Sequence, residues 1–82
     1  MISQKTISIE QLRAARAWLN ISQDEVAALA SVGRRAVADF ERGTRMPHDR
    51  TLNHLQAALE QQGIEFLFNG HKGVGIRLKT ND

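Results

Sequence analysis

The sequences ISIEQL (residues 7–12) and ISQDEV (residues 21–26) follow one design, and they constrain the fold more than any other feature of the chain. In each, a serine can cap a helix, a Gln or Glu three residues later can reach back, and flanking apolar residues can pack together. A capping box with a hydrophobic staple fixes where a helix begins. We therefore predict helices over residues 9–19 and 23–30.

Two further helices are predicted after these. Ser31, Val32 and Gly33 are enough for a tight corner, in which Val32 plugs the inner side and Gly33 serves as an N-cap. The third helix then runs over residues 33–42, with Gly43 as a left-handed C-cap, and the fourth over residues 49–62. The expected buried faces carry Leu12, Ala15 and Leu19; Val26, Leu29 and Ala30; Val37 and Phe40; and Leu52, Leu55 and Leu59.

After Gly63 the apolar pattern changes from helical spacing to alternation. IEFLFN (residues 64–69) and VGIRLK (residues 74–79) are joined by a link with two glycines, which predicts a β-hairpin over residues 63–80 with one apolar face. Two strands alone are marginally stable in water, so this face must pack on the helices or on a second copy of the chain.

The 82 residues suit one small domain, mainly α, spanning the whole chain. Its parts are an N-terminal tail or edge strand (residues 1–7), a helical core (residues 8–62) and the hairpin (residues 63–80). The chain has no cysteine, no apolar run of membrane-spanning length and no signal-peptide core. We therefore expect a cytoplasmic protein with no membrane partner.

Positive charge is concentrated in one part of the chain. The net charge is only +2, which alone does not indicate a nucleic-acid partner. Five arginines nevertheless fall within one short segment: Arg34, Arg35, Arg42, Arg45 and Arg50. Two of them open the third predicted helix, directly after the tight corner.

Two short capped helices joined by a three-residue corner describe a helix-turn-helix. The stretch LRAARAWLNISQDEVAALASVGRRAVADFERG resembles the lambda-repressor/Cro family, also called the xenobiotic-response-element family, of bacterial and phage DNA-binding domains. The resemblance covers about residues 9–62, and SQDEVA, ERG and the helix TLNHLQAALEQQG carry it. It implies a lambda-repressor-like four-helix domain that binds double-stranded DNA.

The resemblance also implies roles by position. The third helix would lie in the major groove, where Arg34 and Arg35 would read base edges, since an arginine fork matches the two acceptors of guanine. Asp39 stands at another reading position and would either accept from a cytosine amino group or hold an arginine in place. Asp24 and Glu25 would face away from the duplex or stay at its rim. The residues expected to grip phosphate are Gln23, Arg42, Thr44 and Arg45.

Two residues depart from the family pattern. Ser31 stands where a turn glycine is usual, and Gly33 stands where a capping hydroxyl is usual. One further pair, Arg16 and Glu41, occupies positions that form a partly buried ion pair in many members of the family. We expect this pair to fix the third helix to the first.

The hairpin has two competing roles, because its apolar face could close the core of one chain or join two chains. Family members commonly bind as symmetric dimers on two half-sites about 34 Å apart. Dimerisation is favoured, because this segment carries much apolar surface for so small a chain. The residues expected at the interface are Ile64, Phe66, Phe68, Ile76 and Leu78.

Other chemistry is poorly supported. The three histidines lack metal-ligand spacing, so we expect no metal and no cofactor. NGHKGVG lacks the ending of a phosphate-binding loop and opens no helix. No serine stands out as a nucleophile, so we expect no enzyme. Trp18 is expected in the core or at an interface rather than stacked on a base.

The sequence thus predicts a dimeric transcriptional regulator, a repressor at a palindromic operator. One alternative is the antitoxin of a toxin–antitoxin pair, which would also bind its own promoter. Another is a protein-interaction module whose helix-turn-helix no longer binds DNA.

Overall fold

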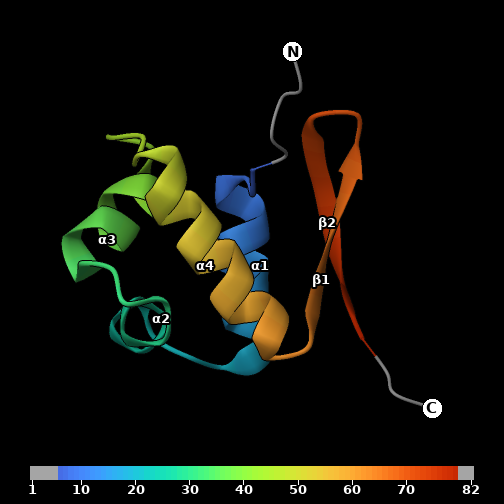
Figure 1. Ribbon diagram of the computed structural model, residues 1–82, viewed down its shortest axis with the longest axis horizontal. Coiled ribbons are helices and arrows are strands. Elements are labelled where there is room, and N and C mark those ends of the chain that lie inside the picture. Colours follow the sequence, from blue (N-terminus) through green and yellow to red (C-terminus); the bar gives the residue numbers. More distant parts are fainter. Residues whose placement is uncertain (1–5, 80–82) are drawn as a thin grey trace.

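The computed structural model describes residues 6–79 and contains four helices followed by a hairpin (Figure 1). The elements are α1 (Ile9–Leu19), α2 (Gln23–Ala30), α3 (Arg34–Arg42), α4 (Asp49–Gln61), β1 (Ile64–Asn69) and β2 (Lys72–Leu78). The predicted fold class is confirmed. Residues 1–5 of the expected tail or edge strand, and position 80 of the expected hairpin, lie outside the described residues. Among the described helices, none is long and apolar enough to cross a membrane.

Both predicted capping boxes are present. The Ser8 hydroxyl accepts from the Gln11 amide at 3.1 Å, and the Ser8 amide donates to Gln11 Oε1 at 3.0 Å. Ser22 and Glu25 repeat the arrangement at 3.0 and 2.8 Å. These side chains satisfy amides that have no partner within the helix, which is why α1 and α2 begin where the sequence predicts.

The four helices enclose one apolar core. The largest fully buried side chains are Phe40, Leu12, Leu55, Leu59, Ile64, Val26 and Val37. One predicted core residue is wrong: Leu29 is 46 % exposed, and Ala27 is buried on α2 in its place. Trp18 is 63 % exposed and therefore lies outside the core. Its alternative place, at an interface, stays a prediction.

The hairpin closes the core of the single chain. Its antiparallel strands pair Ile64 with Leu78 and Phe66 with Ile76, and the sheet packs on α1 and α4. Ile64 and Phe66 are buried, Phe68 and Ile76 are half-buried against the same core, and Leu78 is exposed. The assignment of all five to a dimer interface therefore needs correction, because Ile64 and Phe66 are already covered within one chain. Only the other three keep surface that a second chain could contact.

One buried polar side chain fastens the hairpin to α1. Gln11, besides its part in the capping box, donates through Nε2 to the carbonyls of Leu67 at 2.8 Å and Gly75 at 2.9 Å. Gly73 lies against this amide so closely that a Cβ at that position would collide with Gln11 Oε1. A glycine is needed at Gly73 for this contact rather than for a turn.

The hairpin and α3 lie at opposite ends of the molecule, with α1 and α4 between them (Figure 1). The long axis of the molecule measures 36 Å. The exposed surface of α3 and the outer surface of the hairpin are therefore two separate surfaces, and each could contact a different partner.

Candidate nucleic-acid interface

The turn between α2 and α3 consists of Ser31, Val32 and Gly33. Ser31 ends α2 in the left-handed conformation, with a φ of 56°. Val32 is half-buried against the core, as predicted. Gly33 is the N-cap of α3 in an extended conformation, and it has no side chain to bond the first turn. The serine thus takes the conformation usually left to glycine, and α3 starts without a side-chain cap.

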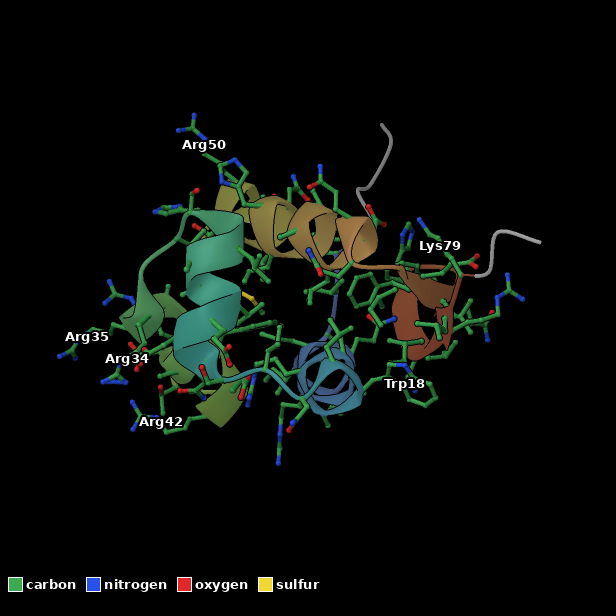
Figure 2. The ribbon with its side chains drawn as sticks, turned by 90° about the horizontal axis from the view of Figure 1, so that it is seen from below. Trp18, Arg34, Arg35, Arg42, Arg50 and Lys79 are labelled. Carbon is green, nitrogen blue, oxygen red and sulfur yellow. The ribbon has the colours of Figure 1, made fainter. Side chains whose placement is uncertain are left out.

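The helix that follows is buried on one side and charged on the other. Val37 and Phe40 anchor α3 in the core, whereas Arg34 and Arg35 on its first turn are exposed. Figure 2 shows Arg34, Arg35 and Arg42 at one end of the molecule, pointing away from it, with Trp18 and Lys79 at the other end. The two arginines predicted to read bases are therefore exposed at this end of the molecule.

The segment after α3 adds to the same surface. Gly43 ends the helix in the left-handed conformation, and the Thr44 hydroxyl donates to the Asp39 carbonyl at 3.2 Å. Arg45 is exposed. A depression of about 280 Å³ lies between Arg35 on α3 and Arg45 on this segment. Arg35, predicted to contact a base, and Arg45, predicted to contact phosphate, thus line one concave region.

The predicted ion pair between Arg16 and Glu41 is present. Arg16 donates to Glu41 through Nε and Nη2, each at 2.7 Å, and through Nη1 to the Ile21 carbonyl at 3.0 Å. The Glu41 side chain is only 6 % exposed. The bidentate geometry therefore ties the last turn of α3 to α1 and to the α1–α2 loop.

Gln23, the first residue of α2, joins this network. Its Nε2 donates to Glu41 Oε1 at 3.0 Å, and the residue is half-buried. The family resemblance implies a phosphate contact for Gln23, whereas the bond to Glu41 has no signal in the sequence. The side chain therefore positions α2 against α3 in the free protein.

The surroundings of Glu41 change its acidity. Burial by itself raises the pKa of the Glu41 carboxyl, but the hydrogen bonds from Arg16 and Gln23 outweigh burial and hold the pKa below its ordinary value of 4.5. The hydrogen bond to Glu41 in turn raises the pKa of Arg16. The pair is therefore ionised at neutral pH.

Two other carboxylates contact the arginines of α3. Asp24 on α2 forms an ion pair with Arg34, with 2.9 Å between Oδ1 and Nε. The sequence did not predict this pairing, and the expectation that Asp24 faces away from the duplex or stays at its rim remains a prediction. Asp39 accepts from Arg42 Nη2 at 2.7 Å, which is the arginine-holding alternative. Glu25, by contrast, is used by the capping box of α2.

Arg35 differs from its neighbours on α3. Within residues 6–79 it forms no ion pair with a carboxylate. Arg50, at the start of α4, is also exposed and was counted in the arginine cluster but not among the site residues. In Figure 2 it points outward from the start of α4, at the top of the view and apart from Arg34, Arg35 and Arg42. Its position in the sequence cluster was the signal that could have added it.

Comparison with known proteins agrees with this geometry. A helix-turn-helix family model matches residues 12–66, which is more than half of the chain. A search among curated proteins finds no match. The matching family consists of DNA-binding regulatory domains and is not typically enzymatic. The chain therefore belongs to the Cro/C1-type helix-turn-helix family, and it is a DNA-binding transcription regulator.

Proposed function

We propose that this regulator is a sequence-specific repressor that binds a palindromic operator as a dimer, with α3 in the major groove. One observation carries the proposal: the first turn of α3 presents Arg34 and Arg35 to solvent at the end of the molecule (Figure 2). The N-terminal residues of a recognition helix are those that reach base edges. An arginine fork there can bond guanine O6 and N7 together.

The remaining predicted site residues differ in which part of the duplex they could contact. Arg42, Thr44 and Arg45 lie at or beyond the end of α3 and suit phosphate contacts, which set register without reading sequence. Gln23 would contact phosphate only from a side chain that Glu41 already orients. Asp39 could accept a hydrogen bond from a cytosine amino group only if its ion pair with Arg42 breaks when DNA binds.

Symmetry limits how two chains can share one duplex. Both α3 helices must enter the duplex from the same side. The two-fold axis must therefore run from the protein toward the DNA, in the direction that the exposed face of α3 looks. Since the hairpin lies at the opposite end, two chains can pair through it only side by side (Figure 1). The exposed Val74 and Leu78 and the half-buried Phe68 and Ile76 support the hairpin as the contact.

Random-site selection on duplex DNA, followed by light scattering of the bound species, tests the proposal. We expect a selected sequence with two-fold symmetry and two chains per duplex. Recovery of an asymmetric site bound by one chain would remove the dimer and the palindrome. Failure to enrich any sequence would remove sequence-specific binding.

Mobility-shift titrations separate the residue roles. Arg34→Ala should weaken binding and relax recognition at one base pair, whereas Arg45→Ala should weaken binding to all sequences and reduce its salt dependence. The reverse pattern would contradict the assignments.

A second candidate is the antitoxin of a toxin–antitoxin pair that also represses its own promoter. The exposure of Trp18, Val74 and Leu78, outside α3, favours an additional protein contact. Expression with the neighbouring gene tests it, because a toxin would co-purify with the chain and would be neutralised by it. Action on bacterial or phage DNA would place either protein in the cytoplasm.

A further inference from the structure

The contact between Asp24 and Arg34 joins α2 to the first turn of the recognition helix. Both side chains are largely exposed, at 73 % and 64 %. Their nearest atoms, Asp24 Oδ1 and Arg34 Nε, are 2.9 Å apart. An exposed ion pair of this kind adds little to folding stability. Its significance lies in where it holds the guanidinium.

Arg34 receives little restraint from its own helix. It is the first residue of α3, and the preceding Gly33 contributes no side chain, with open space where its Cβ would stand. An arginine on a free helix start can sample many rotamers, and ordering it on binding costs conformational entropy. Asp24, at the second position of the capped α2, is the acidic group that contacts Arg34 and can limit this freedom.

The contact at Nε also orients the fork. A guanidinium presents its donors in one plane, so a carboxylate at Nε sets the direction in which the terminal nitrogens point. Two terminal donors in a fixed direction match the paired acceptors of guanine in the major groove. The neighbouring Arg35, without an ion pair within residues 6–79, has no such restraint.

We propose that Asp24 is a specificity-determining residue that acts through Arg34. It orients the Arg34 fork toward one guanine, and its negative charge penalises every duplex that does not supply that contact. The carboxylate thus lowers affinity for DNA in general while it raises the preference for the operator, as repulsive elements do in specific interfaces. This inference rests on the proposed base-reading role of Arg34.

The test compares wild type, Asp24→Asn, Arg34→Ala and the double variant by fluorescence anisotropy. Three duplexes are used: the selected operator, the operator changed at the base pair that Arg34→Ala identifies, and a random sequence. Asp24→Asn should bind the random duplex more tightly, by about three-fold or more at low salt, because a charge facing phosphate is removed. Its discrimination at the Arg34 base pair should fall by about five-fold or more.

Glu10→Gln provides the matched control. Glu10 is the second residue of α1, as Asp24 is of α2, and it is exposed, but within residues 6–79 it forms no ion pair with α3. The Glu10→Gln variant removes one negative charge, as Asp24→Asn does, and should leave discrimination at the Arg34 base pair unchanged. In the Arg34→Ala background, Asp24→Asn should cause no further loss of discrimination at that base pair. Thermal unfolding of each variant verifies that the chain is folded.

The outcomes distinguish the inference from the function on which it rests. If Arg34→Ala loses one base pair of recognition but Asp24→Asn retains full discrimination, or loses it equally at every base pair, Asp24 has no such role. If wild type prefers no sequence, or Arg34→Ala changes no base preference, the proposed reading by Arg34 fails and the inference fails with it.

Discussion

The two ends of α3 are held in opposite ways. At its last turn, Glu41 accepts three hydrogen bonds from Arg16 and Gln23, and Gly43 closes the helix in the left-handed conformation. At its first turn, Gly33 gives no side-chain cap and the arginines extend into solvent. The same nine-residue helix is thus anchored at one end and nearly bare at the other.

The difference shows how a small domain can present a charged surface and remain folded. Five exposed arginines bring no stability of their own, and a helix of this length is unstable alone. Val37, Phe40 and the Glu41 network hold α3 in place from behind. The stabilising contacts are therefore kept on the buried side and at the last turn of α3, away from the first-turn arginines that are proposed to read bases.

The largest effect should come from breaking the anchored end. Glu41→Ala leaves Arg16 without its partner in a partly buried position, so the free energy of unfolding should fall by about 3 kcal/mol. Chemical denaturation measures it. The idea that this pair locks α3 would be abandoned if Glu41→Ala and Arg16→Ala each left the melting temperature unchanged.

A second variant, distant from α3, shows whether this anchoring concerns α3 or merely the whole fold. Gln11→Ala removes the two donors to the hairpin carbonyls and one side of a capping box, so unfolding should become easier by about 2 kcal/mol. At a temperature where both variants are folded, Gln11→Ala should bind DNA like wild type and Glu41→Ala should bind more weakly. Equal losses of DNA affinity would show that general stability decides.

Acid should weaken the anchored end selectively. The pKa of Glu41 lies below its ordinary value of 4.5 in the folded chain, so the pair contributes stability above that value and loses it as the pH falls through the folded pKa. This pH-dependent contribution is only a fraction of the stability that is lost when the Arg16–Glu41 pair is removed. Unfolding free energies from pH 7 to pH 3 should therefore fall more steeply for wild type than for Glu41→Gln, and parallel curves would contradict the assignment.

Replacing Ser31 by glycine, in the turn between α2 and α3, should stabilise the fold. Ser31 adopts a positive φ, which costs an L-residue about 1 to 2 kcal/mol. Glycine removes this strain, but its greater conformational freedom in the unfolded chain offsets part of the gain. Ser31→Gly should therefore raise the unfolding free energy by roughly 0.5 to 1 kcal/mol. Asn20, at a φ of 57° after α1, offers the matched Asn20→Gly, with a smaller gain since asparagine tolerates this conformation. A destabilised Ser31→Gly would show that the hydroxyl has another role.

The smallest effect is expected at the first turn of α3, which has no side-chain cap. Gly33 has a negative φ and open space around the position of a Cβ, so Gly33→Ser can cap α3 without strain. The gain should be a few tenths of a kcal/mol, measured by thermal unfolding. No gain would mean that the first turn is already satisfied in the free protein.

Local signals predicted the helices well, because Ser8 and Ser22 act on amides three residues away. The resemblance to the family supplied the Arg16–Glu41 pair. Leu29 was misplaced because α2 is short, and spacing alone does not decide whether Leu29 or Ala27 follows Val26 into the core.

Contacts between distant segments could not be predicted from pattern alone. The bonds from Gln11 to the hairpin span more than fifty residues. The Asp24–Arg34 pair depends on the angle between two helices, which the departures at the turn leave undefined in the sequence. Alternation in the hairpin identified an apolar face but did not say whether the same chain covers it.

The two-sided bonding of Gln11 makes the hairpin an integral part of the fold. Its carbonyl oxygen serves the start of α1 and its nitrogen serves β1 and β2, so the sheet cannot detach without also fraying the first helix. We expect the protected amides of both regions to exchange with deuterium at one common rate, in a single opening of the whole domain. Deleting the strands would then leave an unfolded chain rather than a smaller reader of DNA.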